Sequence, residues 1–465
     1  MKRLLATLSA ALVVAGAACG LGGCGDKGGS ESQSSKPKVD LEGYEFTWAT
    51  LWDWNNYPEA GASDYGDKRT AWYDQVQKDY NCTIKKVELN ADTFYDQVNK
   101  AIMAGEKFAD FIEVDYSRYQ VLRKTDSLMD LSSIEGFDTA QEKFFKTHTD
   151  AYTEDGKVYG LQYQYSNRAA GNFLFYNKTL LNSEGCEDPY ELVKSNQWTF
   201  AKFEEICKKV TKSTTGGAID RWGLSVVDWH ANNFEKPMIF ANGGSIIAKD
   251  SEGKWTYNLL STQSQNALNY LYQLEAVDQV LVPADKQGKD ATQNFYEGDA
   301  LFYCGTYDNF ASINDNFPEG QEWSIVPLPI GPDADDFINM DTQLRSWVML
   351  GNNVNDASKA ATVFDAISEP LYGSVEQDAE EYYNGQLYNV FNGSEEALEM
   401  FRLCTEKVVP ESSWGMSGSD TIGEAIYSCT RSNAFTPQSA METISGVITG
   451  YIESFFYGPA DTVSG

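Results

Sequence analysis

Positive charge and histidine are both scarce in this sequence. It has 36 lysine and arginine residues against 68 aspartate and glutamate residues, a net charge of −32, and only 2 histidines. An acidic surface is repelled by nucleic-acid phosphates and by anionic lipid, so the composition disfavours binding to either. The 8 cysteines include no Cys-x-x-Cys pair, which argues against zinc and redox sites.

Enzyme motifs are missing as well. The sequence contains no Gly-x-Ser-x-Gly elbow, no glycine-rich phosphate loop and no His-Glu-x-x-His pair. Acidic residues are so common that a pair at glycosidase spacing would carry little information. The acidic segment at residues 333–336 could bind calcium, but it lacks the spacing and the glycine of an EF-hand, which favours a solvated loop. We therefore expect a protein without catalysis, metal ion or cofactor.

The N-terminus carries the pattern of a secretion signal. Lys2 and Arg3 precede an apolar run over residues 4–18, which is too short to span a membrane. The tetrad Leu21-Gly22-Gly23-Cys24 resembles a bacterial lipobox, which implies that Cys24 is acylated and begins the mature chain. Cys19 is a weaker competing site, and a soluble secreted protein is the alternative.

A polar tether follows the signal. Residues 25–40 are rich in glycine, serine and lysine and have no apolar period, so they predict a flexible segment. We expect a signal peptide at residues 1–23 and a tether at residues 24–40. Together they would hold the protein at the extracellular face of the bacterial cytoplasmic membrane by a lipid anchor alone.

The remaining sequence alternates between strand and helix patterns. The first set comprises expected strands at 44–51, 82–89 and 110–114, with helices at 68–80 and 92–103. The second set comprises strands at 173–176 and 223–227, a helix capped by Thr199, helices at 237–244 and 261–276, and strands ending at Gly305 and beginning at Trp323. This alternation predicts α/β layers, in which ligands gather at the carboxyl ends of the strands.

Several motifs follow one another in order along the chain. They are Asp155-Gly156-Lys157-Val158-Tyr159-Gly160, then Tyr176-Asn177-Lys178 with Trp198-Thr199, then Phe295 to Ala300, and then Trp323 to Pro329. In this order they resemble the extracellular solute-binding proteins of ATP-binding-cassette (ABC) importers, the family that includes maltose- and oligosaccharide-binding proteins. Ala109 departs from the pattern, since the family usually has a proline before the third strand.

The resemblance implies an α/β, two-lobed periplasmic-binding-protein type II fold. Each lobe would contain a mixed, mainly parallel sheet flanked by helices, with a multi-strand hinge between them. We expect lobe 1 to comprise residues 41–163 and 348–372, and lobe 2 to comprise residues 164–347 and 373–465. Multiple adjacent connections restrict two lobes to a hinge-like rotation, so we expect the protein to close around a ligand.

Aromatic residues are abundant, with 11 tryptophans, 27 tyrosines and 24 phenylalanines. A sugar presents an apolar face and a rim of hydroxyls, so its site needs flat aromatic rings beside planar polar groups. Such residues gather at the expected strand ends and crossings, and the resemblance places Tyr307 and Trp414 at stacking positions. The expected ligand-binding residues are Trp52, Asp53, Trp54, Asp115, Tyr116, Arg118, Asn167, Trp229, His230, Asn233, Tyr307, Asp308, Trp347 and Trp414.

Structural interpretations compete with several of these assignments. Asp115 and Arg118 could instead form an ion pair with each other, and His230 could be a hydrogen-bonded wall residue. Trp48 alternates within the first expected strand, which favours a place in the core. The six cysteines after Cys24 could form disulfides outside the cell or remain as buried thiols.

The resemblance therefore implies a substrate-binding lipoprotein. It would capture an extracellular carbohydrate, an oligosaccharide in this interpretation, and deliver it as a monomer to the permease of an ABC importer. A surface glycan-binding lipoprotein without a transporter and a binding protein for a non-sugar solute are the alternatives. A secreted glycosidase is a third, although no acid/base pair stands out.

Overall fold

The computed structural model describes residues 39–50, 61, 64–90, 93–163, 165, 171–227, 231–283, 291–342, 344–351, 356–432 and 434–458. The expected signal peptide and nearly all of the tether lie outside these ranges. Within them, no helix combines the length and the apolar character that crossing a lipid bilayer requires.

The first sheet has five strands in the order β2-β1-β3-β14-β6. They are β1 (Tyr44–Thr50), β2 (Cys82–Glu88), β3 (Phe111–Asp115), β6 (Gly160–Leu161) and β14 (Arg345–Val348). β14 runs antiparallel to both of its neighbours, whereas β1 runs parallel to β2 and β3. Every residue of β3 is buried, as expected for a strand that is covered on both faces.

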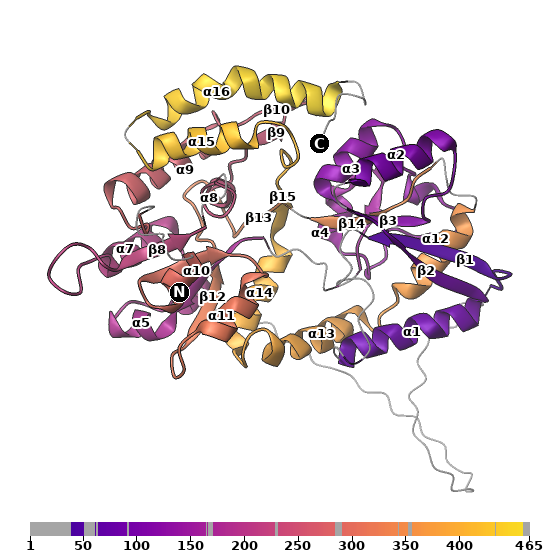
Figure 1. Cartoon of the computed structure of the whole chain (residues 1–465), viewed down its shortest axis with the longest axis horizontal. Coiled ribbons are helices and arrows are strands. Elements are labelled where there is room, and N and C mark those ends of the chain that lie inside the picture. Colours follow the sequence, from indigo (N-terminus) through magenta and orange to yellow (C-terminus); the bar gives the residue numbers. More distant parts are fainter. Residues whose placement is uncertain are drawn as a thin grey trace, which may run out of the picture. The chain divides into compact units, whose positions relative to one another are not determined.

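Helices pack against this sheet (Figure 1). They are α1 (Asp64–Tyr80), α2 (Phe94–Ala104), α3 (Tyr116–Lys124), the short α4 (Lys146–Ala151) and α12 (Ala357–Ile367). Their apolar faces enclose aromatic residues of the strands, such as Phe111, whose ring stacks on Phe364 of α12 at 4.1 Å between centroids. The α/β alternation expected over residues 44–114 is confirmed.

The second sheet has four strands in the order β12-β7-β11-β8. They are β7 (Phe173–Asn177), β8 (Trp222–Val226), β11 (Ala300–Gly305) and β12 (Trp323–Pro327). β7 runs antiparallel to β11 and β12, while β11 runs parallel to β8. Each of the two sheets therefore has one reversed strand among strands of a common direction, which confirms mixed, mainly parallel sheets.

Helices surround the second sheet as well (Figure 1). The α7 helix (Phe200–Val210) begins where expected, because the Thr199 hydroxyl accepts a hydrogen bond from the backbone amide of Lys202. The other helices of this part are α5 (Lys178–Ser183), α6 (Pro189–Lys194), α8 (Glu235–Ala241), α9 (Thr262–Tyr272), α10 (Ala291–Tyr296), α11 (Asn309–Asn316), α13 (Val375–Asn389), α14 (Glu395–Glu406), α15 (Ser419–Thr430) and α16 (Pro437–Ile452).

Small two-stranded sheets complete the described structure. They pair β4 (Thr153–Glu154) with β5 (Lys157–Val158), β9 (Ile247–Lys249) with β10 (Trp255–Tyr257), and β13 (Asn339–Asp341) with β15 (Val408–Pro410). The chain passes from the first sheet to the second after β6, returns before β14, and leaves again after α12.

The second passage occurs earlier in the sequence than the expected boundary. We expected residues up to 347 to belong to lobe 2, but β14 pairs with β3 from Arg345 onward, opposite Asp115. The physical reason is that the ring of Trp347 stacks on Trp48 of β1, so Trp347 belongs to the core of the first sheet.

Candidate functional site

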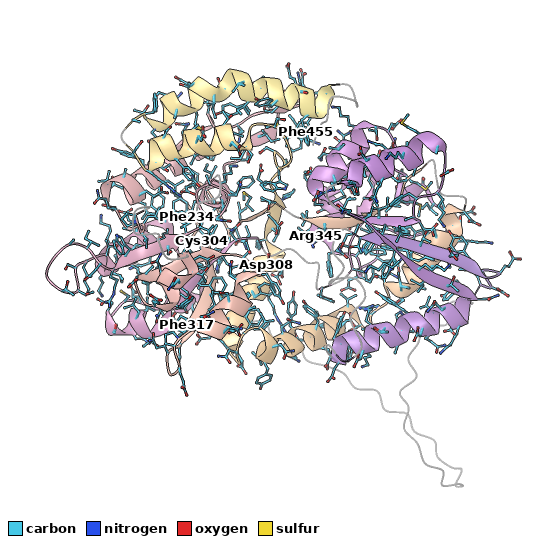
Figure 2. All side chains as sticks on the ribbon, in the orientation of Figure 1. Phe234, Cys304, Asp308, Phe317, Arg345 and Phe455 are labelled. Atoms are coloured by element: carbon cyan, nitrogen blue, oxygen red, sulfur yellow. The ribbon has the colours of Figure 1, made fainter. Side chains whose placement is uncertain are left out.

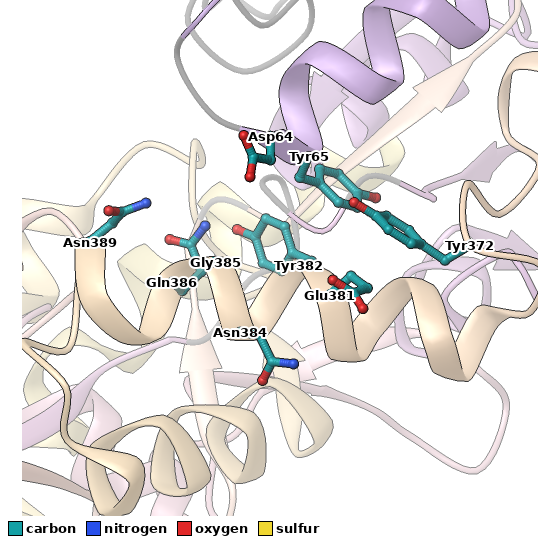
Figure 3. Close-up of a pocket in the computed structure, with 9 residues that line it drawn as sticks. All are labelled: Asp64, Tyr65, Tyr372, Glu381, Tyr382, Asn384, Gly385, Gln386 and Asn389. Carbon is teal, nitrogen blue, oxygen red and sulfur yellow. The ribbon is translucent and has the colours of Figure 1, made fainter.

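A pocket of about 390 Å³ opens between the start of α1 and the helix α13 (Figure 3). This volume lies within the range of small-ligand sites. Its lining consists of tyrosines, carboxylates and amides, namely Asp64, Tyr65, Tyr372, Glu381, Tyr382, Asn384, Gln386 and Asn389, together with Gly385. Aromatic rings beside planar polar groups are the combination that a sugar requires.

Three tyrosines form the aromatic wall of the pocket. The rings of Tyr65 and Tyr372 stack with centroids 6.3 Å apart and planes 14° apart. Tyr382 meets the Tyr65 ring edge-on at 5.4 Å, and the ammonium of Lys68 lies 3.4 Å from the centroid of Tyr372. Figure 3 shows the stacked pair at one end of the pocket and Asn389 at the other.

Tyr307 links the second sheet to this pocket. It follows β11, is 40% exposed, and donates a hydrogen bond through its hydroxyl to the side-chain oxygen of Gln386 at 3.2 Å. The neighbouring Asp308, which is labelled in Figure 2, is exposed, and its carboxylate makes no capping bond to α11. Both of these expected ligand-binding residues are therefore exposed, and Tyr307 contacts the pocket through Gln386.

Asp115, Tyr116 and Arg118 have structural roles instead. Asp115 is 3% exposed; its carboxylate accepts a hydrogen bond from the Arg118 amide at 2.8 Å, caps α3 and forms an ion pair with the Arg118 guanidinium. Tyr116 is buried, and its ring packs against those of Tyr119 and Tyr152. The alternative interpretation of an Asp115–Arg118 ion pair is the one that the structure supports.

Trp347 is a core residue, which corrects its assignment to the ligand site. Its side chain is 0% exposed, and its ring stacks on Trp48 with centroids 5.1 Å apart. The alternating pattern of the first expected strand predicted that Trp48 lies in the core, and its burial confirms this prediction. The sequence places Trp347 near a crossing, but the strand that carries it lies inside the first sheet.

Asn233 and Trp414 lie in partly buried segments. The backbone carbonyl of Asn233 accepts hydrogen bonds from Asn172 at 3.2 Å and from the Cys304 thiol at 2.8 Å, while its side-chain amide donates to Val227. Trp414 is half-buried beside Gly415. Gly415 has a φ of +82° and packs so closely on Ser117 that any side chain at this position would collide with it.

Six of the expected ligand-binding residues lie outside the described residues. They are Trp52, Asp53, Trp54, Asn167, Trp229 and His230, and the expected lipidation residue Cys24 lies outside as well. Asp333 and Asp336, from the acidic segment, are bonded to Asn242 and Lys407 respectively. All six described cysteines are free thiols, and five of them are buried.

The aromatic wall is absent from the ligand-binding residues expected from the sequence. Tyr65 and Tyr382 lie on helices and Tyr372 lies on a crossing, whereas most of the expected contacts lie at strand ends. The signal that could have found Tyr382 is the concentration of tyrosine, amide and acidic residues over 378–389, which belong to α13. Among the described residues, the lining contains two carboxylates and no lysine or arginine, which favours a neutral or cationic ligand over an anionic one.

Solved structures share this fold. The ABC substrate-binding protein Lmo0181 from Listeria monocytogenes, in complex with cycloalternan, is 17% identical over 88% of this chain and 99% of that chain, with a TM-score of 0.57. The cyclic α-maltosyl-1,6-maltose binding protein from Arthrobacter globiformis is 14% identical over 89% and 100%, with a TM-score of 0.63. The sugar-binding protein MalE from Xanthomonas citri is 14% identical over 88% and 98%, also with a TM-score of 0.63.

These similarities confirm the α/β, two-lobed periplasmic-binding-protein type II fold. None of the proteins with curated descriptions matches the sequence. Residues 71–367, more than half of the chain, match the family of bacterial extracellular solute-binding proteins, whose members bind solutes rather than catalyse reactions. The chain therefore belongs to this family and is a bacterial extracellular solute-binding protein.

Proposed function

We propose that the protein captures an extracellular carbohydrate and delivers it to the permease of an ABC importer. The observation that carries this proposal is the pocket of about 390 Å³, in which tyrosine rings stand beside amide and carboxylate groups. The proteins of similar fold that were solved with cycloalternan or are described as binding cyclic α-maltosyl-1,6-maltose are consistent with a sugar ligand. The ligand stabilises a closed form only through its higher affinity for that form.

A melting-shift screen followed by calorimetry tests the choice of ligand. The panel contains maltotetraose, cellotetraose, their monosaccharides, a neutral tetrapeptide and spermidine. We expect at least one oligosaccharide to bind with micromolar affinity, about −8 kcal/mol, which suffices for capture and release. Binding to the peptide or to spermidine alone would refute the proposal that the ligand is a sugar, but it would not contradict the proposed role in solute transport.

The delivery step and the anchor need separate measurements. Copurification of a membrane permease with the detergent-solubilised protein supports delivery, whereas its repeated absence favours a surface glycan-binding lipoprotein. Mass spectrometry of the mature N-terminus tests acylation of Cys24, because lipid chains add a mass that a soluble secreted form lacks. Our proposal is a lipid-anchored monomer at the extracellular face of the cytoplasmic membrane.

A further inference from the structure

A buried ion pair stands directly behind the aromatic wall of the pocket. The side chains of Arg69 and Asp378 are both 4% exposed, and the Arg69 guanidinium lies 3.3 Å from the Asp378 carboxylate. The same guanidinium donates to the backbone carbonyls of Ile367 and Glu369, at 3.2 and 3.1 Å. The pair thus joins α1, the end of α12 and α13 at the third passage of the chain between the sheets.

Asp378 accepts hydrogen bonds from Tyr65 and from the residue before Tyr372, the other ring of the stacked pair. Its Oδ2 accepts a hydrogen bond of 2.9 Å from the hydroxyl of Tyr65. Its Oδ1 accepts a hydrogen bond of 2.7 Å from the backbone amide of Leu371, the residue before Tyr372. One carboxylate therefore fixes the position of the first ring directly and that of the second through the backbone.

Arg69 completes the arrangement around the Tyr65 hydroxyl. It donates to this hydroxyl at 2.7 Å, so the hydroxyl accepts one hydrogen bond and donates the other. Burial raises the pKa of Tyr65 well above its usual range, which keeps the hydroxyl protonated at neutral pH. With its donor and acceptor capacities both used inside the protein, the Tyr65 hydroxyl serves to orient the ring.

A buried ion pair is weak evidence for a stabilising role, because well-packed apolar side chains often give equal stability. What an ion pair with several hydrogen bonds adds is a defined geometry. Here that geometry sets two rings with centroids 6.3 Å apart and planes 14° apart at the wall of the pocket.

We propose that Asp378 and Arg69 are positioning residues that hold Tyr65 and Tyr372 as a preformed aromatic platform for the ligand. This inference rests on the proposed function, since it assigns the platform to the sugar site. A preformed platform avoids the cost of ordering side chains on binding, so loosening it weakens binding without removing a contact.

Two ring-preserving variants give a matched test. Tyr65→Phe breaks the link to Asp378, whereas Tyr190→Phe removes a tyrosine hydroxyl that donates to the Glu399 carboxylate at 2.6 Å, outside the pocket lining. The ligand for this test is the sugar with the largest melting shift in the panel. We expect calorimetry to show a Kd that is roughly three- to tenfold higher in Tyr65→Phe than in the wild type, because a side chain of the wall must now be ordered when the ligand binds. We expect a Kd within about twofold of wild type in Tyr190→Phe, because neither Tyr190 nor Glu399 lines the pocket.

A second readout needs no sugar and so separates this inference from the proposed function. Amide hydrogen exchange of residues 369–373 in the unliganded protein should become faster in Tyr65→Phe and in Asp378→Asn, and should stay at the wild-type rate in Tyr190→Phe. Equal affinities and equal exchange rates in the two ring-preserving variants would overturn the positioning role. If exchange responds as expected and no sugar binds the wild type, the proposed function fails and the positioning of the wall stands.

Discussion

At the scale of single residues, Tyr307 is the strongest expected ligand contact among those described. It is exposed next to the pocket, and its ring packs on Phe401 and Phe310 with centroids 5.6 and 5.7 Å away. Truncation by Tyr307→Ala removes apolar contact worth about 1.5–3 kcal/mol, so we expect the Kd for the sugar to rise roughly ten- to hundredfold.

Calorimetry on Tyr307→Ala and Tyr307→Phe measures this contribution. The phenylalanine variant keeps the ring and loses only the bond to Gln386, so its Kd should stay close to that of the wild type. An unchanged Kd in Tyr307→Ala would remove this residue from the site.

Residue roles could be predicted from sequence where local spacing decides them. Asp115 and Arg118 stand three positions apart, and this spacing was enough to raise an internal ion pair as an alternative. Trp347 and Tyr65 could not be assigned in this way, because their partners are distant in sequence: the Tyr65 hydroxyl bonds a residue 313 positions away. Burial and pairing of this kind depend on the tertiary fold rather than on a local pattern.

At the scale of elements, the cap of α3 is a testable contribution to stability. Asp115→Ala removes both the acceptor for the Arg118 amide and the ion-pair partner of its guanidinium. We expect the free energy of unfolding to fall by about 1–2 kcal/mol, the upper part of the range for N-caps. Asp115→Asn retains an acceptor oxygen and should lose less.

Urea unfolding at neutral pH measures these differences. Similar losses in both Asp115 variants would show that the charge matters more than the cap, whereas unchanged stability in the alanine variant would contradict the capping role. Sugar affinity should remain within about twofold of wild type, because Asp115 is buried away from solvent.

The positions of most of the expected helices and strands could be predicted from the sequence, because they depend on local residue patterns. The helix expected at residues 92–103 matches α2 to within two residues, and the Thr199 cap starts α7. The helix expected at residues 237–244 instead spans Glu235–Ala241, because Pro237 is tolerated in the first turn of a helix and does not mark its start. The order of the strands within each sheet could not be predicted from the sequence, since it depends on pairings between distant segments.

At the scale of the whole molecule, buried thiols should make stability fall at alkaline pH. Burial raises the pKa of Cys82 to about 11 and that of Cys404 to about 12, and burial with the nearby Glu275 raises the pKa of Cys429 to about 12. In the unfolded chain these thiols ionise near pH 8.5, so unfolding releases protons above that pH. The stabilising contribution is complete below about pH 8.5 and is lost as the pH rises toward 11–12.

Urea midpoints measured between pH 7 and pH 10 under reducing conditions test this expectation. Lys236 acts in the opposite direction, because burial lowers its pKa, so the comparison needs Cys404→Ala as a matched variant. We expect the wild type to lose stability more steeply than this variant above about pH 8.5. Identical slopes for the two proteins would contradict a protonated, buried Cys404 thiol.

The reversed strand β14 also has a consequence for the order in which the molecule can fold. It sits between β3 and β6, so residue 345 must reach residue 115 before the first sheet is complete. Pairings between such distant segments are slow to form, because closing a long loop precedes any gain from the contact. During synthesis the first sheet therefore stays unfinished until most of the chain has emerged.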